Sequence, residues 1–172
     1  MRQVELKDIF GYLPYKLKVI YEHSGTATIK VINAEGVIQL CEKGDWRKYH
    51  ILKEIERCKP ILRPRSDLYK TITHNGKEII PIVELAKMVS PELGFDLYVE
   101  NSNEIYAQCG SIERIFYNRG IFSKINGYGH VSAIENQHQL FDYLHELKID
   151  YRGLIDSGLA IDANTLEVNP YK

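Results

Sequence analysis

The sequence predicts an α+β fold in which N-terminal antiparallel strands and a central hairpin pack against C-terminal helices. Short runs that alternate apolar and polar residues, rich in β-branched and aromatic side chains, fill the N-terminal third of the chain. An Asn75-Gly76 pair lies between two more alternating runs, and apolar residues at helical spacing follow near the C-terminus. At 172 residues the chain fits a single domain, 1–172, divided into a β meander (1–42), a mixed helix and hairpin segment (43–100) and a mixed segment ending in helices (101–172).

The predicted meander consists of three strands. They are YKLKVIY (15–21), TATIKVIN (26–33) and GVIQLC (36–41), and short polar or glycine-containing turns separate them. Beyond the meander, the apolar residues of 49–55 fit one face of a helix that runs from Asp45 to near Arg57, and the same short run also fits a strand.

The segment CKPILRPRSDL (58–68) predicts a stiff, ordered connector. Pro60 and Pro64 prevent a continuous helix through it, because proline lacks the backbone N–H that a helix interior needs. Ser66 can cap a short helix that runs on through Leu68 and Tyr69.

The remaining predicted elements are a hairpin at 71–80, a helix at 82–89, strands at 97–100 and 104–109, and C-terminal helices at 136–149 and 151–162. The hairpin has the clearest signal, since an Asn-Gly pair suits a two-residue hairpin turn. The secondary structure of residues 111–132 stays open because glycines interrupt any long helix there.

Composition excludes several classes of protein. The formal net charge is -1, from 22 basic and 23 acidic side chains, so no global field would draw the chain onto nucleic acid or an anionic membrane. Three cysteines without a CxxC pair fit reduced thiols rather than a disulfide frame or structural zinc. No signal peptide and no run of about 18 apolar residues is evident. We therefore expect a cytoplasmic protein with no membrane contact, built without cofactor or metal.

Several stretches resemble, as a set, a group of small proteins encoded by phages and prophages of gut bacteria. They are ELKDIFGYLPYKLKV (5–19), KPILRPRSDL (59–68) with THNGKEIIPIVEL (73–85), and YRGLIDSGLAIDANTL (151–166). The group carries KP-[IL]-LRP-x-SDL and GLI-x-x-GLAID blocks, and the resemblance implies a setting in the host bacterial cytosol but no activity. Arg65 stands where this group is expected to have an apolar residue, which favours a partly exposed loop.

A local excess of positive charge marks a first candidate site. Residues 43–70 contain nine Lys and Arg and four acids, whereas residues 133–172 contain seven acids and three Lys and Arg. Lys59, Arg63 and Arg65 would suit a phosphate, because guanidinium groups on a proline-stiffened loop match its geometry. Alternatively, this basic stretch pairs with the acidic C-terminal region or is solvated.

A second candidate site combines cations and rings around flexible glycines. Its candidate ligand or phosphate contacts are Arg114, Tyr117, Arg119, Tyr128 and His130. Aromatic stacking with a cation at phosphate is how proteins hold bases and nucleotides. Alternatively, the phenylalanines of the same segment, Phe116 and Phe122, are core residues.

No catalytic or metal-binding signature is present. Cys58 and Cys109 are possible thiol nucleophiles with His50, His74 or His130 as possible bases, but no local motif ties a pair together. His138 and His145 lie seven residues apart, too far along a helix to share one ion. The Asp142 and Glu146 carboxylates fit the solvent-exposed face of an amphipathic helix.

Three functions follow as hypotheses. The favoured one is a phage-type accessory binding protein, without catalytic activity, that engages a host protein and acts against host defence. The alternative is a sponge that sequesters a phosphate-bearing, for example cyclic, nucleotide immune signal. A Cys/His hydrolase is the third and least favoured hypothesis.

Overall fold

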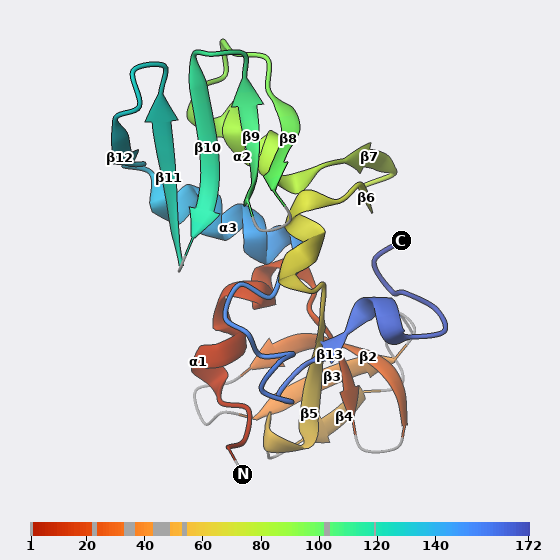
Figure 1. Ribbon diagram of the computed structural model, residues 1–172. Coiled ribbons are helices and arrows are strands. Elements are labelled where there is room, and N and C mark those ends of the chain that lie inside the picture. The colour runs from red at the N-terminus through yellow and green to blue at the C-terminus, as the bar shows by residue number, and fades with distance from the viewer. Residues whose placement is uncertain are drawn as a thin grey trace. The chain divides into compact units, whose positions relative to one another are not determined.

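The computed structural model describes residues 2–172 except 22–23, 33–36, 43–48, 53–54, 102–103 and 119 (Figure 1). For residues 24, 42, 49–52, 101 and 104 it describes the backbone alone. The chain divides into two compact units: unit 1 is Met1–Pro64 with His145–Pro170, and unit 2 is Arg65–Leu144 with Tyr171–Lys172. Antiparallel sheets and helices occur together, as predicted for an α+β fold. None of the helices in these ranges is long and apolar enough to cross a membrane.

Unit 1 holds a sheet of six strands within the described ranges. The strands are β1 (Lys18–Tyr21), β2 (Ser24–Ile32), β3 (Ile38–Glu42), β4 (Tyr49–Leu52), β5 (Cys58–Leu62) and β13 (Ile161–Asp162). They lie in the order β13-β5-β1-β2-β3-β4, and all pairs are antiparallel except β13 with β5. The predicted three-stranded meander is thus confirmed as β1, β2 and β3.

The segment 49–55 corrects one sequence-based expectation. Residues 49–52 form β4 and pair with β3, from Ile38 opposite Leu52 to Cys41 opposite Tyr49, and η2 (Ile55–Arg57) is a single 3-10 turn. The helix prediction is therefore wrong for these residues, and the alternative, a strand, is confirmed. Hydrogen bonding to the edge strand of the meander stabilises residues 49–52 more than their weak helical spacing of apolar side chains would. Residues 45–48 and 53–54 of the predicted helix lie outside the described residues.

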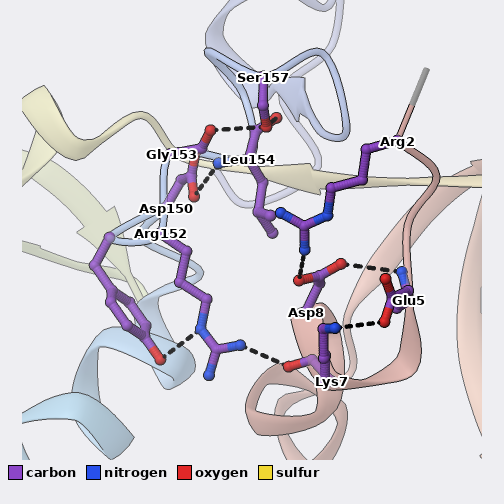
Figure 2. Close-up of polar contacts among 10 residues, drawn as sticks. Arg2, Glu5, Lys7, Asp8, Asp150, Arg152, Gly153, Leu154 and Ser157 are labelled. Atoms are coloured by element: carbon purple, nitrogen blue, oxygen red, sulfur yellow. Dashed lines mark hydrogen bonds and ion pairs between the residues drawn. The ribbon is translucent and has the colours of Figure 1, made fainter.

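The chain enters unit 1 through α1 (Leu6–Ile9) and η1 (Phe10–Tyr15). Asp8, which is buried, caps the first turn by accepting a bond from the Glu5 N–H at 3.0 Å, and Arg2 pairs with the same carboxylate at 2.5 Å (Figure 2). Tyr12 is fully buried and donates its hydroxyl to the Ile149 carbonyl at 2.8 Å. The core beneath the sheet is apolar and includes Ile9, Leu17, Val19, Ile29, Ile38, Leu40 and Leu62.

The second C-terminal helix, predicted at 151–162, is also corrected. Residues 151–158 form turns in which Asp150, buried, accepts bonds from the backbone N–H groups of Leu154 at 2.9 Å and Ile155 at 2.7 Å. Figure 2 shows the Asp150 to Leu154 bond and the neighbouring bond from Ser157 to the Gly153 carbonyl. Gly153 and Gly158 have φ of 74° and 73°, which a helix does not allow. The turns lead into β13 and then η4 (Ala163–Thr165).

Unit 2 begins with short elements, most of which match the prediction. The first, Arg65–Tyr69, starts one residue before Ser66, so Ser66 lies inside this 3-10 helix and is not its N-cap as predicted. Residues 58–62 of the predicted connector form strand β5 of unit 1. η3 (Arg65–Tyr69) is followed by the hairpin β6 (Ile72–His74) and β7 (Lys77–Ile79), then by α2 (Pro81–Val89). Asn75 and Gly76 have φ of 50° and 74°, both positive, as the predicted two-residue hairpin turn requires. Pro81 occupies the first turn of α2, where its missing N–H costs no hydrogen bond.

A five-stranded antiparallel meander completes the described part of unit 2. Its strands are β8 (Asp96–Asn101), β9 (Glu104–Cys109), β10 (Glu113–Asn118), β11 (Ile121–Asn126) and β12 (Val131–Ala133), in the order β12-β11-β10-β9-β8. The segment 111–132, left open by the sequence, is therefore mostly strand. α3 (Gln137–Leu147) follows β12 and confirms the first predicted C-terminal helix.

The two faces of this sheet differ in character. Ala107, Ile115 and Phe122 are fully buried on the face that packs against α2 and Phe141. By the alternation of strand residues, Tyr98, Tyr106, Arg114, Phe116 and Ile125 share the opposite face. That second face carries the candidate site.

Candidate functional site

A pocket of about 450 Å³ opens in unit 2 where β9 and β10 separate. The two strands are paired from Glu113 opposite Cys109 only as far as Ile115 opposite Ala107. Beyond that point β10 keeps its partner β11 to Asn118, and β9 keeps its partner β8 to Glu104. The end of this pairing therefore leaves a gap between β9 and β10, and each strand is still hydrogen-bonded to its other neighbour.

Aromatic rings and two opposite charges line the pocket. Tyr69, Tyr106, Phe116 and Tyr117 supply the rings, Glu100 and Arg114 supply the charges, and Asn118 adds an amide. Residues from both faces contribute because the pocket reaches through the gap in the sheet. Such a mainly apolar wall with a few polar groups is typical of a small-molecule site.

Glu100, Tyr106 and Arg114 form a connected polar group on the wall. The Tyr106 hydroxyl donates to Glu100 Oε2 at 2.8 Å, and Arg114 Nη1 lies 3.5 Å from the same oxygen. Arg114 Cζ is 5.2 Å from the centre of the Tyr106 ring, a cation–π distance. Burial, followed by the hydrogen bond to Glu100, raises the pKa of Tyr106 to about 12, so its hydroxyl stays a donor at neutral pH.

Part of this group is open to a ligand. Glu100 and Arg114 side chains are 45% and 42% exposed. In the part of the chain that the structure describes, Glu100 Oε1 and the Nε and Nη2 groups of Arg114 make no hydrogen bond. The pocket therefore offers one free carboxylate oxygen beside free guanidinium donors.

Tyr69 and Tyr117 form the inner side of the pocket. Tyr117 packs against Phe122 with ring centres 4.9 Å apart and against Phe141 at 6.5 Å, so its ring is fixed by the core of unit 2. Burial raises the pKa of Tyr69, and the charge of Arg65 lowers it in the opposite direction. Arg65 is exposed, and its charge acts on the hydroxyl of Tyr69, which lines the pocket.

The three cations of the first predicted site differ in exposure and in the unit to which they belong. Lys59 is exposed on β5 and Arg63 is only 3% exposed, both in unit 1, whereas Arg65 starts η3 in unit 2. The backbone of Arg63 bonds to the Lys148 carbonyl and to the Asp150 N–H, each at 2.8 Å. Burial lowers the pKa of Lys148 to about 8; Glu146 opposes this, while Arg63 and Lys16 lower it further.

The second predicted site is only partly brought together. Arg114 and Tyr117 line the pocket, whereas Tyr128, 90% exposed, and His130 lie in the turn between β11 and β12. Asn126 builds this turn by accepting bonds from the N–H groups of Tyr128 at 3.0 Å and His130 at 3.1 Å. Arg119 lies outside the described residues.

The residues considered for catalysis are divided between the two units. Cys58 is 1% exposed in unit 1, while Cys109 and His130 belong to unit 2 and share no hydrogen bond among the described residues. The side chain of His50 is not among those described. No group of three or more His, Cys, Asp or Glu in these ranges is placed to hold a metal ion.

Sequence reasoning missed Glu100 and Tyr106, and it favoured the core for Phe116, which lines the pocket. A signal existed, since the alternation in LYVE, EIYAQC and ERIFYN places polar and aromatic residues on one face of three neighbouring strands. The alternation of residues does not predict where β9 and β10 stop pairing, and the pocket forms at that point.

Comparison with known protein families, with curated proteins and with solved structures gave no match to this chain.

Proposed function

We propose that the protein is a non-catalytic binding module whose pocket in unit 2 takes a nucleotide. The observation that carries this proposal is the convergence of four aromatic rings and Arg114 in about 450 Å³, with Arg65 nearby. Pockets of roughly 300 to 1,000 Å³ suit small ligands. Rings that stack on a planar base and cations that attract phosphate are the two contacts a nucleotide needs.

The phage resemblance supplies the biological side of the proposal. A phage-encoded protein without catalytic activity that binds a nucleotide would act by sequestering it, which fits removal of a host immune signal. This function was the alternative in the sequence-based ranking, and the pocket is the reason to place it first.

Titration of the whole chain with a panel of nucleoside monophosphates, cyclic nucleotides and dinucleotides tests the proposal by calorimetry and thermal shift. A ligand at a hundred times its Kd should stabilise the fold by about 2.7 kcal/mol. Phe116→Ala should weaken binding about tenfold, since stacking contributes about 1 to 3 kcal/mol per base. Tyr128→Ala is the matched control, because this ring is exposed and lies outside the pocket. Absence of binding across the panel would overturn the proposed function.

A host protein is the second candidate partner, and exposed apolar side chains favour it. Tyr98, Ile121 and Val131 are 47%, 53% and 64% exposed and share the pocket face of the sheet by register. Burying such a surface is the usual source of protein affinity. Pull-down from host lysate should recover a stoichiometric partner that the Ile121→Asp, Val131→Asp double variant loses and that Val168→Asp, exposed in unit 1, retains.

A further inference from the structure

We propose that Glu100 selects the base in this pocket and that the preferred ligand carries guanine. This inference rests on the proposed function, nucleotide binding, and adds to it the chemical class of the base. It is argued from the polar group formed by Glu100, Arg114 and Tyr106.

The Glu100 carboxylate is held in one orientation. Oε2 accepts the Tyr106 hydroxyl at 2.8 Å, and Tyr106 is itself 6% exposed, with its ring 5.3 Å from that of Tyr98. Because the phenol is anchored in the sheet, the hydrogen bond fixes where Oε1 points. A carboxylate positioned in this way reads a ligand edge with little loss of side-chain freedom.

Among the described residues, the wall offers the free donors of Arg114 beside one free carboxylate oxygen, Glu100 Oε1. Oε2 accepts from the Tyr106 hydroxyl at 2.8 Å and from Arg114 Nη1 at 3.5 Å, so both of its lone pairs are used. Oε1 keeps two lone pairs and can accept two neighbouring donors of a planar partner that also faces the Arg114 guanidinium. In this arrangement Arg65 is the cation that remains for the phosphate.

Guanine carries the complementary order on its pairing edge: the O6 acceptor, then the N1–H donor, then the N2 amine donor. Adenine and cytosine each present one amine beside a ring nitrogen acceptor, which a carboxylate oxygen repels. Hypoxanthine keeps O6 and N1–H but lacks the amine. The expected order of affinity is therefore guanine, hypoxanthine, then adenine.

Calorimetric titration of the whole chain with GMP, IMP and AMP tests this order. GMP should bind about tenfold or more tightly than AMP, the discrimination expected of a bidentate contact, with IMP between them. Glu100→Gln should remove most of the GMP preference while AMP binding changes little, since the amide replaces one acceptor with a donor. Asp96→Asn, an exposed acid on the same strand and face, should keep the preference.

Failure of the inference is distinguishable from failure of the proposed function. Binding of all three nucleotides with equal affinity, unchanged by Glu100→Gln, would overturn base selection and leave nucleotide binding standing. Binding of none of them, with binding of another nucleotide of the panel, would overturn base selection alone, and absence of binding across the whole panel would overturn both. If Glu100→Gln does not fold, Tyr106→Phe serves instead, because it keeps the ring and removes the bond that orients Glu100; an unchanged GMP preference in that variant counts against the inference.

Discussion

At the scale of single residues, His145 shows how little a residue type says about its role. It was weighed as a metal ligand from its spacing to His138, but its ring is 8% exposed and packs edge-on against Tyr12, with centroids 4.7 Å apart. Its Nε2 lies 2.9 Å from the Tyr151 hydroxyl. The ring also lies directly over Gly11, and so explains why position 11 has no side chain.

Gly11→Ala should destabilise unit 1 by about 1 to 3 kcal/mol, the usual cost of overpacking a core. The added Cβ would overlap the His145 ring, with Nδ1 at 2.7 Å and two ring atoms closer still. Urea unfolding followed by circular dichroism measures the change. Gly25→Ala is the control, because a Cβ there meets nothing within 4 Å. Equal stability of the two variants would show that the His145 ring moves aside freely.

Some of the candidate site could be predicted at this scale. Arg114 and Tyr117 followed from the mixture of cations and rings in the sequence, and both line the pocket. Glu100 and Tyr106 look like ordinary strand residues, since only the register of β8 on β9 brings them together. Arg63, singled out as a phosphate ligand, is buried, and no property of its neighbours in the sequence indicates that.

At the scale of elements, local chemistry decided which predictions held. The hairpin β6–β7 was predictable because Asn75 and Gly76 both adopt positive φ, which their residue types allow. The helix at 151–162 was not found, because Asp150 caps a set of turns and two glycines take conformations outside the helical region. The buried residues of this segment are Leu154, Leu159 and Ala160, a spacing that does not follow one face of a helix.

Asp150→Ala should destabilise these turns by about 2 kcal/mol or more. It leaves the backbone N–H groups of Leu154 and Ile155 without their acceptor, and an unsatisfied buried donor costs about 1 to 3 kcal/mol. Thermal and urea unfolding give the difference. Asp156→Ala, an exposed acid in the same turns, is the matched control and should change stability by less than about 0.5 kcal/mol.

At the scale of the whole molecule, the division into two units was not readable from the sequence. Composition and length fit one domain. The boundary at Pro64 and Arg65 lies inside the predicted connector 58–68, but the sequence alone did not mark that connector as the end of a unit. Unit 1 is discontinuous, so its second part, His145–Pro170, is separated from Met1–Pro64 by the whole of Arg65–Leu144. Only pairings such as β13 with β5 reveal that the two parts belong together.

The two units should respond oppositely to alkaline pH. Lys148 of unit 1 has its pKa lowered from 10.5 to about 8, so between these values the unfolded chain holds a proton that the folded chain has released, and stability rises with pH. Tyr106 of unit 2 has its pKa raised from 10.0 to about 12, so the folded chain keeps a proton that the unfolded chain loses, and stability falls above pH 10.

Urea unfolding across this pH range checks both signs. Relative to wild type, Lys148→Met should lack the rise between pH 8 and 10.5, and Tyr106→Phe should lack the fall above pH 10. The same pH dependence in wild type and Lys148→Met would contradict the first assignment, and in wild type and Tyr106→Phe the second.

The hydrogen bonds of Arg63 with Lys148 and Asp150 have a consequence for synthesis of the chain. When residues 1–64 have left the ribosome, β5 has its partner β1, but its other side, which takes Ile161 and Asp162, faces water. Closing that side requires residues 65–144 to be made first, because the bonds at Arg63 join the chain on either side of them. A nascent protein therefore carries an open strand edge with Ile61 and Leu62 until residue 162 is made, about 100 codons later, which exposes it to chaperone binding and to edge-to-edge association.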